Sequence, residues 1–371
     1  MRHLSSVQPV CLLSLCAVLL GSTAVAQQAA PVPATPSSPP SLSVDRDPVP
    51  SPDGDVPPPA AAGQTSAPAD QVQRSGGTYT LRTNVGEVRL NATVLDGGGR
   101  IIQSLPRDAF HVYEDGVPQT ITSFRHEDLP VSLGVLIDSS GSMYDKRAAV
   151  SKASLDLIRL SNPKDEAFLV DFSFEPYIDQ DFTSDIHKLE AGLSYVKASG
   201  GTAIYDTVIA SADYLARNAK QPKQVLLLVT DGDDNASSTS LEEAVKRVQE
   251  LDGPVIYCVG LLFGPDEDKR ESRHARRVLQ SLAEQTGGIA YFPRRLEEVD
   301  QIAAQVAADI RQQYTISYQP SKPARLGGYR QVHVDAKANG FSRLQVRTRA
   351  GYYPKNVAAG PASVAGSGST Q

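Results

Sequence analysis

Five oxygen-bearing residues in three separate stretches of the chain have the types and spacing needed to hold a hard metal ion. They are Asp138, Ser140, Ser142, Thr202 and Asp231. Carboxylate and hydroxyl oxygens, with no Cys or His among them, favour Mg²⁺ over Zn²⁺, with Mn²⁺ or Ca²⁺ as alternatives. The first three alternate along the chain, and Gly141 gives the backbone room between them. We therefore expect a divalent-cation site built from these five side chains.

The elements around these residues would bring them together. Residues 131–137 and 224–230 are short apolar runs of the kind found in buried parallel strands, and each ends at an aspartate. Thr202 lies in a Gly-Gly-Thr loop before an expected helix over 204–217. Ligand sites of doubly wound sheets lie outside the carboxyl ends of the strands, which is where all three stretches would meet. The alternative for Asp138–Ser142 is a plain strand-to-helix turn with a capping residue.

The middle of the chain predicts an α/β fold. Over residues 130–313, apolar strands alternate with amphipathic helices, which indicates a doubly wound, mostly parallel, Rossmann-like domain. We expect helices over 146–160, 185–196, 204–217, 240–251, 273–285 and 296–313. We expect strands over 131–138, 167–174, 177–182 (a charged edge), 224–230, 255–261 and 289–292.

The flanks of this domain carry β patterns. Residues 78–129 alternate apolar and polar side chains and contain an Asp115-Gly116 turn, a strong hairpin signal, before an expected strand over 117–124. Residues 314–354 alternate in the same way. Neither flank is long enough to close a core alone. We therefore predict that the two flanks form one small all-β sandwich into which the α/β domain is inserted.

The N-terminus predicts export. Residues 1–26 combine Arg2, an apolar run and a small-residue cleavage site ending at Ala26, which is typical of a signal peptide. An uncleaved anchor is the alternative. Residues 27–77 and the tail 355–371 are rich in small residues and proline and predict disordered spacers. No second apolar run is long enough to span a membrane, so we expect a secreted or periplasmic protein.

Composition excludes some partners. The formal net charge is −6, which gives no electrostatic footprint for nucleic acid. Cys258 is the single cysteine outside the expected signal, so no internal disulfide can form in the mature chain. We interpret Asp233, Asp234 and the basic stripe around His274 as solvated charges, and Asp206 as serving the first turn of its helix.

The five-residue pattern resembles the von Willebrand factor type A family, known also from integrin inserted domains. The family motif is Asp-x-Ser-x-Ser with a distant Thr and a distant Asp, and it matches here in order and spacing. The resemblance covers about residues 130–313. The flanking sequences 110–119 and 349–354 resemble, less specifically, a bacterial exported subgroup with this domain.

The resemblance implies a metal-ion-dependent adhesion site. Ser140, Ser142 and Thr202 would match the direct ligands in the partner-bound state, while Asp138 and Asp231 would act largely through water. The cation would keep one position for a carboxylate of a partner protein. In the family, ligand exchange between Thr and Asp can couple the site to movement of the last helix, here 296–313.

Binding is favoured over catalysis. None of the three site loops contains a His, and the chain has neither a Gly-x-Ser-x-Gly elbow at Ser140 nor a Gly-x-Gly-x-x-Gly loop after its first α/β strand. A metal-dependent phosphohydrolase with Asp138 as nucleophile would want a carboxylate at position 140 and a nearby Lys, and we find no Lys in the site loops. We predict a non-enzymatic adhesion module. The alternatives are a structural scaffold with an idle metal site and, less favoured, the phosphohydrolase.

Overall fold

The computed structural model describes residues 39–43, 72–75, 78–81, 86–160, 162–194, 199–263 and 269–355. The predicted signal peptide, most of the predicted spacer and all but the first residue of the predicted tail lie outside these residues. Two pieces of the spacer are described. One is β1 (Val72–Ser75), which pairs antiparallel with β2 (Thr78–Leu81). The other places Ser43 beside Tyr177 in a single bridge, because the edge strand there has backbone groups left to pair.

A six-stranded sheet forms the centre of the α/β domain. Its order is β12-β11-β10-β7-β8-β9, and all pairs are parallel except β8 with β9. Its strands are β7 (Val131–Asp138), β8 (Glu166–Phe172), β9 (Pro176–Thr183), β10 (Lys223–Thr230), β11 (Val255–Gly260) and β12 (Ala290–Tyr291). Every residue of the central strand β7 is buried, as its apolar sequence predicts.

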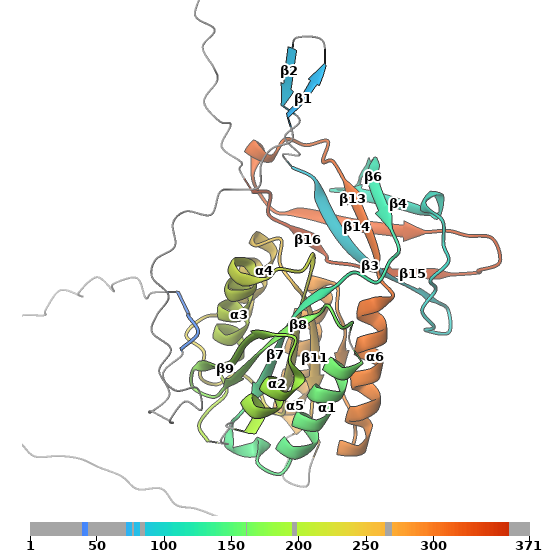
Figure 1. Ribbon diagram of the computed structural model, residues 1–371. Helices are drawn as coiled ribbons and strands as arrows, with labels where there is room; N and C mark the ends of the chain where they lie inside the picture. Colours follow the sequence, from blue (N-terminus) through green and yellow to red (C-terminus); the bar gives the residue numbers. More distant parts are fainter. Residues whose placement is uncertain are drawn as a thin grey trace, which may run out of the picture. The chain divides into compact units, whose positions relative to one another are not determined.

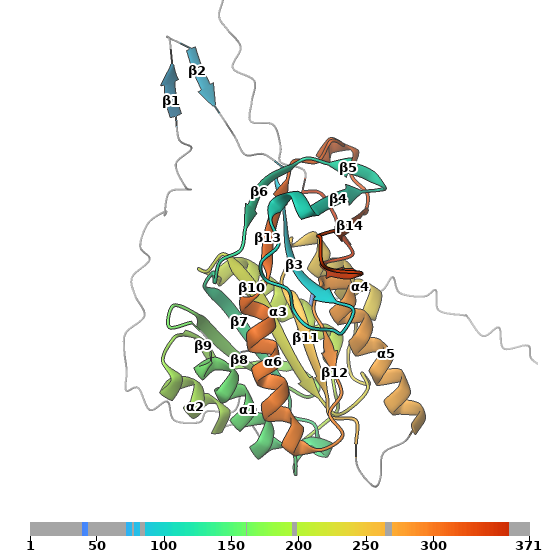
Figure 2. The ribbon, with the colours of Figure 1, turned by 90° about the vertical axis from the view of Figure 1, so that its right-hand side faces the viewer.

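Helices cover both faces of this sheet (Figures 1 and 2). One face packs on α1 (Arg147–Arg159), α2 (Ile186–Ser194) and α6 (Val299–Arg311). The other packs on α3 (Ile204–Asn218), α4 (Leu241–Glu250) and α5 (Lys269–Thr286). The doubly wound α/β prediction is therefore confirmed. Side chains of Ser240 and Glu243 form the capping box that opens α4, with bonds of 3.2 and 2.8 Å.

The flanking segments form two antiparallel sheets around their own core. One sheet has the order β15-β3-β13-β6 and the other β16-β14-β4-β5. Each sheet contains strands from both flanks, which pair as β13 with β3 and as β14 with β4, so the predicted sandwich closes only when both flanks are present. Its strands are β3 (Val88–Asp96), β4 (Phe110–Glu114), β5 (Val117–Gln119), β6 (Ile121–Arg125), β13 (Tyr314–Tyr318), β14 (Arg330–Ala336), β15 (Leu344–Arg347) and β16 (Gly351–Tyr352).

Residues 117–124 differ from the single strand that we expected. They divide into β5, which pairs with β4, and β6, which pairs with β13 in the other sheet. The inward-facing pattern begins only at Ile121, because Val117 is exposed whereas Ile121 is buried in the sandwich core. The chain therefore crosses between the two sheets at Thr120.

A buried ion pair lies inside the sandwich. Arg330 and Glu114 are almost fully buried, and their side chains are joined by a 3.0 Å hydrogen bond. The hydroxyls of Tyr318 and Tyr352 donate to the other oxygen of Glu114, each at 2.8 Å. A second ion pair, Arg347 with Asp309 of α6 at 2.5 Å, connects the sandwich to the α/β domain.

Several helix ends differ from prediction by one or two residues, which reflects fraying and short 3₁₀ turns. The last predicted helix divides into the 3₁₀ turn η3 (Leu296–Glu298) and α6. The fifth begins four residues earlier than expected, at Lys269, and strand β8 ends two residues earlier, at Phe172. Within the part of the chain that the structure describes, no helix is long and apolar enough to cross a membrane.

Candidate metal centre

Asp138 is the last residue of β7, and its side chain is held in place from both sides. One carboxylate oxygen accepts a 2.8 Å bond from the amide of Ser140. The other accepts a 2.5 Å bond from the hydroxyl of Thr230, the last residue of β10. Because the side chain lies between two buried strands, Asp138 has no exposed surface. Its carboxylate is thus fixed at the carboxyl edge of the sheet.

Burial also changes the acidity of Asp138. Loss of solvent raises the pKa of its carboxyl to about 6, although the bonds from Thr230 and Ser140 act in the opposite direction. The neighbouring carboxylate of Asp231 adds to the increase in pKa. A carboxylate that is costly to ionise in this position is one that a bound cation would stabilise.

Ser140, Ser142 and Asp231 continue the same hydrogen-bonded chain. The 3₁₀ turn η2 (Gly141–Met143) follows Ser140 and brings the hydroxyls of Ser140 and Ser142 to within 3.1 Å of each other. The hydroxyl of Ser142 then donates to Asp231 at 2.8 Å. Four of the five predicted ligands therefore form one connected group, although Ser142 and Asp231 are 89 residues apart.

Thr202 lies beside this group in a loop bound to the ends of the strands. Its amide donates to the side chain of Asn235 at 2.9 Å, and its carbonyl accepts from the amide of Asn235 at 3.0 Å. Its hydroxyl oxygen lies 3.6 Å from the position that a Cβ would take on Gly232, the residue after Asp231. No direct bond joins the Thr202 hydroxyl to the other four residues among the described contacts.

Lys146 is a site residue that sequence reasoning missed. Its amine donates to the second oxygen of Asp231 at 2.7 Å and to the carbonyl of Leu261 at 3.3 Å, and it lies 5.4 Å from the centre of the Phe263 ring. The expectation that the site loops contain no Lys was wrong, because α1 begins at Arg147 and Lys146 is the last residue of the loop that follows β7. From there its side chain reaches the site. Its position one turn after Ser142 was the available signal.

Three neighbouring acidic residues have structural partners that we did not expect. Asp206 accepts bonds from the amides and hydroxyls of Ser238 and Thr239, so it holds the loop between β10 and α4 rather than its own helical turn. Asp234 accepts a 3.1 Å bond from the amide of Tyr205, in the first turn of α3. Asp233 pairs with His274 of α5 at 2.6 Å. Each of these three carboxylates therefore has a protein partner and is more than a solvated charge.

The donor set fits a hard divalent cation. It offers two carboxylates and three hydroxyls, and all five are oxygen donors. Among the described residues, no group of three or more His, Cys, Asp and Glu side chains has metal-binding geometry, and the candidate set itself contains only two such residues. Asp138, Ser140, Ser142, Thr202 and Asp231 would hold the cation, and the cation would supply a coordination position for a partner's oxygen.

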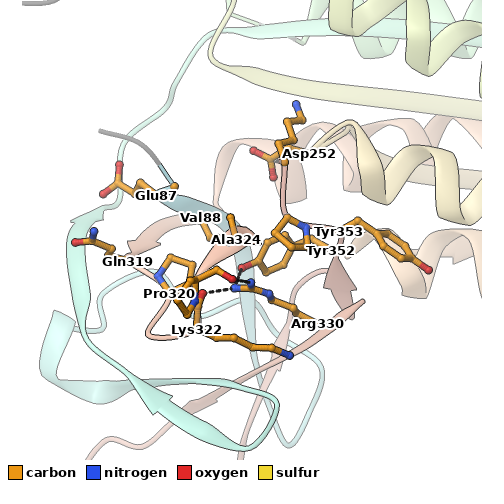
Figure 3. Close-up of a pocket in the computed structure, with 14 residues that line it drawn as sticks. Glu87, Val88, Asp252, Gln319, Pro320, Lys322, Ala324, Arg330, Tyr352 and Tyr353 are labelled. Atoms are coloured by element: carbon orange, nitrogen blue, oxygen red, sulfur yellow. Dashed lines mark hydrogen bonds between the residues drawn. The ribbon is translucent and has the colours of Figure 1, made fainter. Parts of the chain in front are cut away.

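A cavity elsewhere in the molecule does not involve these residues (Figure 3). It has a volume of about 370 Å³ and is lined mainly by sandwich residues, including Tyr352 and Arg330. The guanidinium of Arg330 is held there by the carbonyls of Lys322 and Pro323, each at 2.8 Å. Because Glu114 and these carbonyls pair the terminal nitrogens of Arg330 within the fold, we assign the wall of this cavity a structural role.

Together, the fold and this group of oxygen donors define a doubly wound α/β domain with a candidate cation site at the carboxyl end of its sheet. Residues 133–233, which contain all five predicted ligands, match the family model of the von Willebrand factor type A domain. The resemblance inferred from the motif is therefore confirmed over these residues. This class of domain suggests a protein-interaction module. A comparison with curated proteins finds no match.

Solved structures with a similar fold include three bacterial examples. A von Willebrand factor type A protein from Catenulispora acidiphila is 14% identical to this chain, with a TM-score of 0.42. The match covers 72% of this chain and 75% of that protein. The PilB minor pilin from Streptococcus sanguinis is 14% identical with a TM-score of 0.40, covering 50% and 62%. The vWF domain of the type V pili tip protein Mfa5 from Porphyromonas gingivalis is 14% identical with a TM-score of 0.39, covering 49% and 97%. Likeness at this level says nothing about what this chain binds.

Proposed function

We propose that this protein is an exported adhesion-type module that binds another protein through a divalent cation, with Mg²⁺ as the preferred ion. The observation that carries the proposal is the connected group of Asp138, Ser140, Ser142 and Asp231 at the carboxyl end of the sheet. Two carboxylates, one of them paired with Lys146, leave a bound cation with little donated charge. Such a cation attracts a further carboxylate, which a partner protein would supply.

The geometry of Asp138 argues against the phosphohydrolase alternative. A nucleophilic carboxylate needs an oxygen that can reach the substrate. Both oxygens of Asp138 accept hydrogen bonds, and the side chain has no exposed surface. Lys146 supplies the amine that such an enzyme would use, but it contacts Asp231 rather than Asp138.

Metal binding is tested by thermal unfolding of the full chain with Mg²⁺ or Mn²⁺, compared with the Asp138→Ala variant. A cation at about one hundred times its Kd should stabilise the protein by about 2.7 kcal/mol. In a domain of this size that free energy corresponds to about 5–10 °C in Tm. We expect the increase in the unmutated chain and its loss in Asp138→Ala. An unmutated chain that gains no stability from either cation would contradict the site.

Partner capture with and without EDTA separates the remaining alternatives. Capture that EDTA abolishes supports the adhesion module, whereas capture that ignores EDTA favours the structural scaffold. Phosphoester turnover that is lost in Asp138→Asn would instead support the enzyme. Export is tested by N-terminal sequencing of the protein released from its cells, which should begin after Ala26.

A further inference from the structure

Two aromatic side chains stand exposed beside the candidate metal centre. Tyr144 is 73% exposed and Phe174 is 65% exposed. These are the two largest exposed fractions among the large hydrophobic side chains that the structure describes. Aromatic rings bury large areas when they pack, so leaving both in water beside a binding site is a feature to explain.

Tyr144 belongs to the loop that carries the two serines. It follows the 3₁₀ turn η2, two residues after Ser142, and its amide bonds back to the carbonyl of Gly141 at 3.4 Å. The preceding residue, Met143, is fully buried and anchors the loop in the core. The ring of Tyr144 therefore starts from a backbone position fixed by the site itself.

Phe174 lies next to the loop that carries Thr202. We expected it to end the strand over 167–174, but β8 ends at Phe172 and leaves Phe174 in the turn that follows. Its ring lies over Gly200 and Gly201, where an added Cβ would come within 2.9 Å of ring atoms. The two glycines therefore make room for the ring directly before the Thr202 ligand. A ring seated in this way is held in one place although it is exposed.

We propose that Tyr144 and Phe174 form the apolar rim of the partner-binding face, and that the partner presents a single carboxylate flanked by aliphatic or aromatic side chains. This inference rests on the proposed function, because the carboxylate is the group that the cation would take. Each ring supplies apolar area beside a loop that carries candidate ligands. Tyrosine is among the residues enriched at interface hot spots, and both aromatic rings bury large apolar areas when a partner covers them.

The charges next to the rings decide between possible occupants. Tyr144 is followed by the exposed Asp145, and Phe174 by the exposed Glu175. These two carboxylates repel an acidic run in the partner, which favours one carboxylate in an apolar setting over several in sequence. They also repel an anionic membrane surface, into which exposed aromatic rings could otherwise insert.

The test is a selection of short random peptides, each with a central Asp or Glu, on the immobilised full chain in Mg²⁺ with elution by EDTA. We expect eluted peptides to be enriched in aliphatic and aromatic residues beside the carboxylate. One such peptide should bind Tyr144→Ser and Phe174→Ser at least about tenfold more weakly, as expected for interface hot spots. Both variants should keep the Mg²⁺ affinity of the unmutated chain. Leu326→Ser, which changes another exposed hydrophobic residue in the sandwich, is the matched control and should bind normally.

The outcomes separate this inference from the function on which it rests. EDTA-eluted peptides with acidic or random flanks, or with unchanged affinity for both ring variants, would refute the apolar rim and leave the metal-dependent module standing. Selection that yields no EDTA-sensitive peptide contradicts both. Mg²⁺-dependent self-association that both ring variants abolish would assign the rim to a second copy of the chain. Binding to phosphatidylserine vesicles that both variants abolish would assign it to a membrane, and either result overturns the proposal.

Discussion

Replacement of Lys146 by Met is the sharpest test of the candidate centre, because this amine and a metal ion would act on the same carboxylate. The Lys146 amine is 2.7 Å from Asp231, whose side chain has no exposed surface, while the side chain of Lys146 is 18% exposed. Removing one partner of a buried pair costs about 3–5 kcal/mol, and the partial exposure of Lys146 lowers our expectation to about 2–3 kcal/mol. In EDTA, Lys146→Met should therefore unfold about 5–10 °C below the unmutated chain.

The same substitution should strengthen the binding of the cation. Asp138, Asp231 and Lys146 together carry a formal charge of −1, and the substitution changes it to −2. A monovalent and a divalent cation about 6 Å apart repel each other by about 1.4 kcal/mol even at the dielectric constant of water. We therefore expect the Kd for Mg²⁺, measured by calorimetry, to fall by about tenfold or more in Lys146→Met. Mg²⁺ should then restore much of the stability that the variant loses in EDTA.

Lys152→Met is the matched control. Lys152 lies on the same helix, α1, but it is 59% exposed and pairs with Asp156 and Asp300 at the surface. Its loss should cost less than about 1 kcal/mol and leave the Mg²⁺ affinity unchanged. The reasoning is refuted if Lys146→Met is as stable as the unmutated chain in EDTA, or if its Mg²⁺ affinity is unchanged or weaker.

Three further outcomes follow from buried groups. Folding raises the pKa of Asp138 from 3.8 to about 6, so the folded state binds the proton more tightly than the unfolded state. In EDTA the free energy of unfolding should therefore fall by about 3 kcal/mol as the pH rises from about 4 to 6. Asp138→Asn should lack this decline in urea unfolding, and an identical decline in that variant would assign it to other groups. Arg330→Met should destabilise the chain by about 3–5 kcal/mol in urea unfolding, whereas the double variant with Glu114→Gln should lose less, because no unpaired charge stays buried. Burial raises the pKa of the Cys258 thiol, so iodoacetamide should modify it only in urea, and labelling of the native chain would contradict its burial.

The exposure of Tyr144 and Phe174 illustrates what local patterns leave open. Phe174 follows an apolar run, and the expected strand over 167–174 included it, whereas Tyr144 lies in a polar loop. Whether a ring at the end of a strand is buried depends on what lies opposite it. Here the facing residues are Gly200 and Gly201, which cover one side of the Phe174 ring and leave the other in water. That arrangement depends on how two distant loops meet.

The sequence alone determined the order of the elements and the five candidate ligands. Apolar runs and helical periodicity are local properties, so the α/β domain and its insertion between two β flanks could be predicted without coordinates. The motif also predicted that Asp138, Ser140 and Ser142 lie together, and the strand end and the short 3₁₀ turn bring them together. The predicted sandwich needed one further step, namely that two incomplete hydrophobic faces must cover each other.

Only the tertiary structure decided which charges meet at the site. Lys146 and Asp231 are 85 residues apart, and their contact depends on the register of β10 beside β7 and on where α1 begins. The partners of Asp206 and Asp233 depend in the same way on loops that follow other strands. Such contacts join side chains through space, so spacing along the chain does not show which partners meet, although the position of Lys146 one turn after Ser142 gave a local signal. The candidate ligands could be predicted from the sequence, whereas the pairing of the Lys146 amine with Asp231 could not.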